Sequence, residues 1–357
     1  MNEMVYVQIT PISELLFRDT TKLDKGSSNW IVSKKIPNLS VLYGAMISMQ
    51  LRKGKLKDVY QLICGTQDGD LGKQKEIDHK LKEKICIQGI YLKDKNHIYI
   101  PAPLDLFYYV EDDNVYLQQG VYIDNILCPP DNVQEWESVE HKFISLEDYE
   151  EYKEGNFDYI SLSDEEDFFT YYHKVGIEIG KDHRVKESHL YYTDMITFKK
   201  EDMGYVIGVE STETLELSGD GEIIELGGKR RMAYISQVED EDLLWDIHSN
   251  IEKKEGKFQV KLILTAPFVL AQNEELFKEN RGIIIGSRAT RKYEYQGGYN
   301  MANNTQKPLR KIIVAGSVLC LEIEVEEEIQ NLYDYIRDSF HLEDGDKDFN
   351  SFLLVEM

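Results

Sequence analysis

The loop Gly227-Gly228-Lys229-Arg230-Arg231 combines the residue types that a phosphate-binding loop requires. Paired glycines let the backbone adopt positive φ and approach a ligand closely, so that N–H groups face phosphate oxygens. Three consecutive cations then neutralise the charge of the ligand. A surface hairpin turn with solvated charges is the ordinary alternative, because such turns are common. The loop alone therefore does not indicate a binding site, and other basic segments must support it.

Three further segments combine cations with glycines or aromatic rings, at residues 16–19 with 34–35, 288–299 and 307–317. In bound single-stranded RNA, cations contact phosphates while aromatic side chains stack on unpaired bases. Phe17 and Tyr43 are the stacking candidates, although ordinary core packing also explains such rings. The predicted RNA-binding residues are Phe17, Arg18, Lys34, Lys35, Tyr43, Gly44, Gly227, Gly228, Lys229, Arg230, Arg231, Arg288, Arg291, Gly297, Gly298, Gly316 and Ser317.

The elements that must position these residues begin with a strand, which alternating apolar residues predict at 5–9. A long loop then leads to a helix that is predicted to begin at Ser40 and to end near Lys53, with one apolar face. The loop exceeds the usual length of such connections by far, and long loops in compact domains are often functional.

The remaining pattern predicts an α+β fold. A helix after the first strand and another before the last is the order of a ferredoxin-like βαββαβ sheet, here with elaborations. We expect a hairpin from 190–198 and 205–209, helices at 240–254 and 326–340, and strands at 85–89, 98–100, 232–238, 260–264, 282–285, 318–325 and 352–355.

The length and composition indicate two domains in a globular protein. The chain has 357 residues, of which 42% are hydrophobic and 30% charged. We expect an N-terminal domain at 1–130, an acidic insertion or interdomain segment at 131–175, and a C-terminal domain at 176–357. The first residues do not resemble a signal peptide and no apolar run is long enough to span a bilayer, so a cytoplasmic protein is expected. Four scattered cysteines predict reduced thiols.

Charge is distributed unevenly along the acidic chain, whose formal net charge is −24. Residues 1–100 hold 16 Lys and Arg against 11 Asp and Glu, whereas residues 135–170 hold 13 acids and 2 bases. An acidic total argues against unspecific nucleic-acid binding over the whole surface. A local basic groove is still compatible with it, because salt screens charges within about 8 Å.

Catalytic motifs are absent from the sequence. His173, His183 and His189 are near one another in the chain, and a histidine beside a phosphate is able to act as a general base in RNA cleavage. No partner pattern supports such a role, and no nucleotide-binding, hydrolase or zinc-protease motif occurs. We therefore expect a protein that is not an enzyme and that has no metal, cofactor or small-molecule substrate.

Six segments together resemble the family of the third RAMP subunit of the Cmr complex, the type III-B CRISPR RNA-guided effector. They occur in the order of that family and span residues 4 to about 325. The segments are Leu16-Phe17-Arg18-Asp19, Pro37-Asn38-Leu39-Ser40-Val41-Leu42-Tyr43-Gly44-Ala45, Ile100-Pro101-Ala102-Pro103-Leu104-Asp105-Leu106, Leu226-Gly227-Gly228-Lys229-Arg230-Arg231-Met232-Ala233, Tyr295-Gln296-Gly297-Gly298 and Val314-Ala315-Gly316-Ser317-Val318.

The resemblance implies two linked ferredoxin-like RAMP domains with long loop insertions. It also implies a non-catalytic subunit that binds the 5′ tag of the crRNA at the base of the complex, beside the large Cas-ten-type subunit and neighbouring RAMP subunits. The family's glycine-rich ending is replaced here by Asp348-Phe349-Asn350-Ser351-Phe352. The acidic residues 131–170 match no segment of the family.

Two alternative functions remain open at this point. A metal-independent pre-crRNA endoribonuclease of the RAMP superfamily would place a histidine or tyrosine at the scissile phosphate and would cleave repeat RNA. A purely structural linker would bind partner subunits without RNA.

The predicted basic groove implies a strong dependence of RNA affinity on salt. If about six phosphates are neutralised, affinity falls by roughly 10³-fold or more between 50 and 200 mM salt. Filter binding of the full chain to crRNA at several salt concentrations measures the slope. A flat response contradicts a binding mode based on phosphate contacts.

Overall fold

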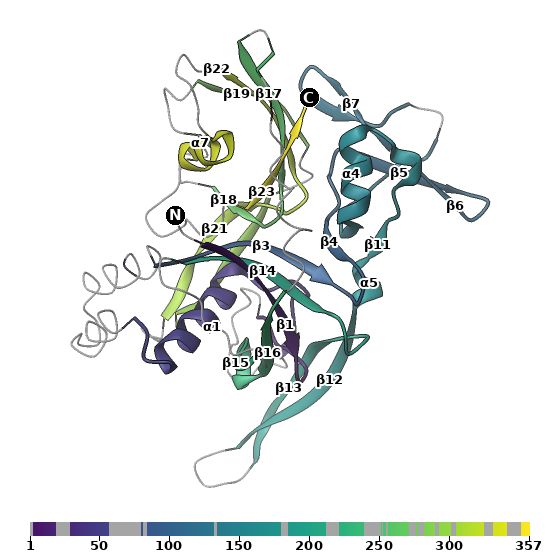
Figure 1. Cartoon of the computed structure of the whole chain (residues 1–357). Coiled ribbons are helices and arrows are strands. Elements are labelled where there is room, and N and C mark those ends of the chain that lie inside the picture. Colours follow the sequence, from purple (N-terminus) through teal and green to yellow (C-terminus); the bar gives the residue numbers. More distant parts are fainter. Residues whose placement is uncertain are drawn as a thin grey trace. The chain divides into compact units, whose positions relative to one another are not determined.

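The computed structural model of the chain (Figure 1) describes a protein of mixed α and β structure, mostly strands with few helices. The mixed composition that the sequence predicts is confirmed. The described residues are 3–18, 29–56, 80, 84–131, 134–179, 185–211, 221–238, 251, 253–254, 256–270, 276–277, 282–289, 293–300, 305–324, 331–340 and 351–357.

The chain forms two compact units, each assembled from three separate segments. Unit 1 comprises Met1–Ile87, Glu165–Gln237 and Tyr295–Arg310, and unit 2 comprises Gln88–Asp164, Val238–Glu294 and Lys311–Met357. The division into consecutive domains at 1–130, 131–175 and 176–357 stays a prediction. The chain passes between the units within strands, among them β3 (Ile85–Lys93), whose first residues belong to unit 1.

The main sheet of unit 1 has the strand order β3-β14-β1-β16-β15. The predicted opening strand is confirmed as β1, whose Val7 and Ile9 are fully buried, and it pairs antiparallel with β14 and β16. A hairpin joins β15 to β16, with the short 3-10 helix η2 (Gly228–Arg230) between them. The strand bounds are β1 (Glu3–Pro11), β14 (Gly204–Ser211), β15 (Glu222–Glu225) and β16 (Met232–Gln237).

Helix α1 (Leu39–Arg52) follows β1 along the chain, close to where the sequence predicts a helix. Its N-cap is Asn38 rather than Ser40, so the helix begins two residues earlier than an N-cap at Ser40 predicts. Leu42 and Met46 are fully buried on its apolar face, while Arg52 donates a hydrogen bond to the carbonyl of Ile223 in β15. No helix among the described ranges is both long and apolar enough to cross a bilayer.

A second sheet of unit 1 contains the long antiparallel hairpin of β12 (Phe169–Ile179) and β13 (Val185–Phe198), seen in Figure 1. Strand β2 (Asn29–Val32) adds to β13 in parallel orientation. The predicted hairpin of 190–198 with 205–209 is therefore wrong. Residues 190–198 pair with β12 and β2, whereas residues 205–209 pair with β1.

Unit 2 contains a six-stranded sheet of order β23-β17-β22-β19-β8-β7. Helix α7 (Leu332–Ser339) packs on it through Tyr333 and Ile336, which join the apolar core of β17, β22 and β23. The predicted helix at 326–340 is confirmed over residues 332–339, whereas residues 240–250 and 252 of the helix predicted at 240–254 lie outside the described residues. The bounds are β7 (Val121–Ile123), β8 (Ile126–Cys128), β17 (Lys257–Leu264), β19 (Ile283–Ala289), β22 (Val318–Glu324) and β23 (Phe352–Glu356).

Smaller elements complete the structure. In unit 2, β3 continues to β4, β10 and β11, and β5 pairs with β6 and β9. Strand β18 pairs with β21, which also neighbours β20. The bounds are β4 (Ile98–Pro101), β5 (Leu106–Glu111), β6 (Asn114–Gln119), β9 (Glu137–Ser138), β10 (Lys142–Ser145), β11 (Ser163–Asp164), β18 (Phe268–Val269), β20 (Tyr293–Asn300), β21 (Thr305–Ile313), α4 (Leu146–Glu154), α5 (Glu165–Phe168) and η1 (Phe157–Tyr159).

The acidic insertion is an ordered part of unit 2 over most of its length. Helix α4 begins with a capping box, in which Ser145 and Asp148 each bond the backbone N–H of the other. Tyr152 on this helix donates to the fully buried Asp105 at 3.0 Å, and Lys261 of β17 lies 3.2 Å from the same carboxylate. This buried, paired carboxylate fixes the insertion to the main sheet of the unit.

Gly316 allows the turn between β21 and β22 to pack against residues 101–104. It adopts φ +83°, and a Cβ there would meet the carbonyl oxygen of Ala102 at 2.7 Å. Its N–H donates to Leu264, and its carbonyl accepts from the N–H of Leu104. The requirement for glycine at this position arises from contacts within the protein.

Gly316→Ala is therefore expected to lower the free energy of unfolding by about 1–3 kcal/mol, from the left-handed conformation and the backbone clash. Gly44→Ala is the matched control, because its Cβ meets nothing within 4 Å on helix α1 and alanine favours helix by up to about 1 kcal/mol. Urea denaturation of the two variants measures the difference. Equal stability would contradict the packing role of Gly316.

Candidate RNA-binding site

Three of the predicted segments form one hydrogen-bonded structure in unit 1. The N–H of Gly228 donates to the carbonyl of Leu16 at 2.8 Å, and the N–H of Lys34 donates to the carbonyl of Phe17 at 2.9 Å. The N–H of Phe17 in turn donates to the hydroxyl of Ser33 at 2.8 Å. Residues 16–18, 33–35 and 227–231, which lie far apart in sequence, therefore meet as the prediction of a shared site requires.

Gly227 explains why the first glycine of the loop is needed. It adopts φ +76°, and a Cβ would lie 2.8 Å from the carbonyl oxygen of Leu16 and 3.1 Å from the Phe17 ring. A side chain here would separate the loop from residues 16–17. The glycine therefore serves the junction between the segments, rather than the direct approach of a ligand to its own backbone.

Lys229 and Arg230 project from the tip of this β15–β16 hairpin and are exposed. Both adopt left-handed backbone conformations, with φ of 60° and 52°, which non-glycine residues seldom adopt. Such strain persists where surrounding structure enforces it, and it is common at ligand-binding segments. The ammonium of Lys229 lies 5.0 Å from the centre of the Tyr191 ring, so a cation and an aromatic face occur together.

Arg231 is part of the fold, in contrast to its two neighbours. Its guanidinium lies 3.3 Å from the Glu14 carboxylate and 3.5 Å from the sulfur of Met195, and its side chain is 22% exposed. Removing it would leave the Glu14 charge without this pair. The predicted role of Arg231 in phosphate binding is therefore weaker than that of the two exposed cations.

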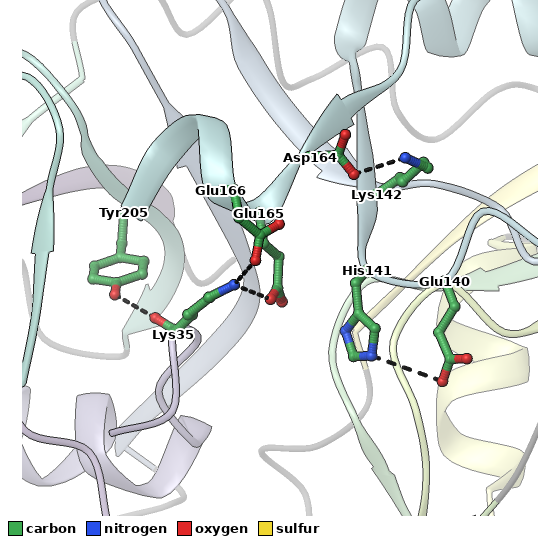
Figure 2. Close-up of polar contacts among 8 residues, drawn as sticks. All are labelled: Lys35, Glu140, His141, Lys142, Asp164, Glu165, Glu166 and Tyr205. Carbon is green, nitrogen blue, oxygen red and sulfur yellow. Dashed lines mark hydrogen bonds and ion pairs between the residues drawn. The ribbon is translucent and has the colours of Figure 1, made fainter. Parts of the chain in front are cut away.

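Lys35 is also engaged by acidic side chains (Figure 2). Its ammonium lies 3.0 Å from Glu165 and 2.6 Å from Glu166, at the start of helix α5, and its side chain is 12% exposed. Burial lowers the pKa of Lys35, but hydrogen bonds and attraction from the two glutamates outweigh it, so the pKa lies above its ordinary value of 10.5. Its carbonyl accepts from Tyr205 at 2.6 Å. Lys35 therefore holds residues 33–35 against helix α5.

The remaining predicted residues of unit 1 differ in accessibility. Phe17 is 2% exposed and packs edge-on against Tyr205, so stacking on a base would require it to leave the core. Arg18 and Gly44 are exposed, whereas Lys34 and Tyr43 are half-buried. The pair Gly297-Gly298 lies within strand β20 and not in the predicted loop.

The predicted residues of unit 2 are held by their own unit. Arg288 donates to the hydroxyl of Tyr293 at 2.6 Å, and Lys311 lies 3.9 Å from the centre of the same ring. Ser317 is fully buried beside Gly316, with no hydrogen-bond partner for its hydroxyl within the described part of the chain. Arg291 lies outside the described residues. The geometry therefore joins the predicted cations of unit 1 and leaves Arg288, Gly316 and Ser317 to unit 2.

Sequence reasoning missed the acids that determine which cations are exposed. Glu14 pairs with Arg231, and Glu165 with Glu166 holds Lys35. In unit 2, Asp164 likewise pairs with Lys142 at 2.7 Å (Figure 2). The sequence shows these acids as an unpatterned excess, and no spacing rule identifies partners that lie from 22 to 217 residues apart.

Comparison with known proteins agrees with the family that the six sequence segments resemble. A family model described as CRISPR-associated protein (Cas_Cmr3) matches residues 7–344. Comparison with curated protein sequences gives no match.

Solved structures of type III CRISPR complexes resemble the chain. A chain of a Type III-B Cmr-beta complex bound to cognate target RNA is 17% identical, with 94% of this chain and 90% of that chain covered and a TM-score of 0.51. Another Cmr-beta structure, bound to cognate target RNA and AMPPnP, has 17% identity, coverage of 88% and 86%, and a TM-score of 0.49. A Csm3-Csm4 subcomplex of the type III-A complex has 12% identity, 99% coverage of both chains and a TM-score of 0.42.

Lys35→Met is expected to lower the free energy of unfolding by about 1–3 kcal/mol, because the partly buried Glu165 and the exposed Glu166 lose their partner. Since the pKa of Lys35 is raised on folding, its contribution is complete below about 10.5 and is lost as pH rises through the folded pKa. Arg230→Met is the control, because this exposed cation should leave stability nearly unchanged. Denaturation at neutral pH measures the free energy of unfolding of both variants. Equal losses in the two would contradict the stabilising role of Lys35.

Proposed function

This chain belongs to the Cas_Cmr3 family of CRISPR-associated proteins, as a subunit of a type III-B effector complex, and we propose that it holds the 5′ tag of the crRNA there as a non-catalytic RNA-binding subunit. The observation that carries the proposal is the junction of residues 16–18, 33–35 and 227–231. It presents Arg18, Lys229 and Arg230 together in one unit of an otherwise acidic chain.

The chemistry of this cationic junction suits a phosphate backbone. Lys229 and Arg230 carry charge on a turn whose backbone is strained, so little further ordering is needed when a ligand binds. The neighbouring acids Glu14, Glu165 and Glu166 are engaged by Arg231 and Lys35. This internal pairing reduces the repulsion that an RNA strand would otherwise meet at the junction.

We also propose that the two main sheets are the cores of two ferredoxin-like domains. In unit 1 the order β3-β14-β1-β16, with α1 between β1 and β3 in the chain, places the four strands as second, third, first and fourth. In unit 2 the order β19-β22-β17-β23 repeats this arrangement, with α7 between the third and fourth strands. The strand order of both sheets supports a βαββαβ fold, of which one of the two helices is described in each unit.

We propose that neighbouring subunits of the complex, including the large Cas-ten-type subunit, contact unit 2 at β7 and β8. The exposed apolar side chains Val121, Ile123 and Ile126 lie on this hairpin at the edge of the six-stranded sheet. Exposed apolar edge strands are surfaces that proteins usually cover. This location leaves unit 1 to the RNA and gives the chain a linking role.

The double variant Lys229→Ala/Arg230→Ala is expected to weaken crRNA binding by about 30-fold, at about 1 kcal/mol for each lost phosphate contact. The slope of log affinity against log salt should fall by about 1 to 2. Lys199→Ala/Lys200→Ala is the matched control, because it removes the same charge from another exposed turn of unit 1. Both are measured by filter binding of the full chain, and equal losses in the two variants would remove the hairpin from the site.

A further inference from the structure

The hairpin of β5 and β6 in unit 2 carries exposed apolar side chains on both of its faces. Val110 and Val115 lie opposite each other on the two strands, and they are 60% and 52% exposed. Tyr116 is 40% exposed on the other face, because side chains alternate between the faces of a strand. The end of the hairpin extends past helix α4 in Figure 1. Apolar side chains that gather at one exposed place usually mark a contact with another molecule.

Contacts within unit 2 order this hairpin in the free chain. The ring of Tyr109 stacks on that of Tyr116, with centroids 4.9 Å apart, and meets the ring of Trp136 edge-on at 4.8 Å. At the base of the hairpin, Gln119 donates to the fully buried carboxylate of Asp105 at 2.7 Å. A surface that is already ordered loses little conformational entropy on binding, so more of its contact energy contributes to affinity.

The end of the hairpin is acidic. Glu111, Asp112 and Asp113 are exposed, and residues 106–119 contain no lysine, arginine or histidine. Asp112 and Asp113 form the two-residue turn with φ of 48° and 60°, a conformation that the uncharged asparagine and glycine adopt equally well. Among the described residues, none of the three carboxylates has an ion-pair partner. Three adjacent carboxylates repel one another, and a cationic partner would relieve that repulsion.

We propose that this hairpin inserts into a groove of another protein of the effector complex, whose apolar walls contact Val110, Val115 and Tyr116 and whose lysine or arginine side chains pair with the acidic turn. Charge favours this occupant over RNA, because the three carboxylates repel phosphates. Complementary charges across an interface raise the rate and the specificity of association. The contact is separate from the one proposed at β7 and β8, and it does not depend on RNA binding by unit 1.

The test titrates the full chain onto the other subunits of the effector complex, which are coexpressed without it and immobilised. Asp112→Asn/Asp113→Asn should weaken binding by about 5- to 30-fold and reduce its dependence on salt, because two charge pairs are lost while asparagine still fits the turn. Glu201→Gln/Asp202→Asn is the matched control, because it removes the same charge from an exposed turn of unit 1. Equal losses in both variants would overturn the inference.

The apolar side chains have a different signature in the same titration. Val110→Thr/Val115→Thr should weaken binding by about 5- to 30-fold and leave the salt dependence unchanged, because each added hydroxyl is buried in an apolar groove. Threonine keeps the shape and the strand preference of valine, so urea denaturation of this variant should match wild type. Wild-type affinity in this variant would overturn the inference.

Further outcomes identify other occupants. If the hairpin variants bind the other subunits as wild type does but change crRNA affinity in filter binding, RNA occupies the hairpin and the inference is overturned. If they change only the self-association of the isolated chain, the occupant is a second copy, with the same consequence. If Ile123→Ser weakens subunit binding and the hairpin variants do not, the contact proposed at β7 and β8 stands without this one. A wild-type chain that does not bind the other subunits would overturn both.

Discussion

The hydrogen bond from the N–H of Gly228 to the carbonyl of Leu16 is the interaction on which the candidate site depends. It joins the β15–β16 hairpin to a loop more than two hundred residues earlier in the chain. The left-handed Gly227 brings the hairpin into contact with Phe17, and Leu16 packs in turn beneath the β12–β13–β2 sheet. One backbone contact thus places exposed cations and the edge of an aromatic sheet in the same unit.

Internal pairing explains how a chain of net charge −24 retains a cationic surface. Glu14, Glu165 and Glu166 are used by Arg231 and Lys35, two of the predicted phosphate ligands. Those two cations stabilise the fold, and Lys229 with Arg230 is left exposed at the turn. The distribution of charge between structural and exposed positions, more than the total, determines what such a surface attracts.

The sequence predicted the local elements well because β1, α1, β16 and β17 each carry a clear apolar period. It also predicted one shared groove for residues 16–19, 34–35, 227–231, 288–299 and 307–317, of which hydrogen bonds join 16–18, 33–35 and 227–231. The sequence did not predict partners that only tertiary contacts determine. Examples are the pairing of β13 with β12 and β2, and the ion pairs of Lys35. Gly316 was predicted to contact RNA, whereas the structure explains the glycine by packing against Ala102. The sequence alone does not distinguish a glycine needed for packing from one needed for ligand contact.

Photo-crosslinking tests the central claim most directly. An effector complex is purified with the full chain and with crRNA that carries 4-thiouridine in its 5′ tag, and the crosslinked peptides are identified after irradiation. The account predicts adducts on residues 16–18 and 227–231 of this chain, and fewer when the label is placed at the opposite end of the crRNA. Adducts confined to other subunits, or to unit 2 of this chain, would contradict it.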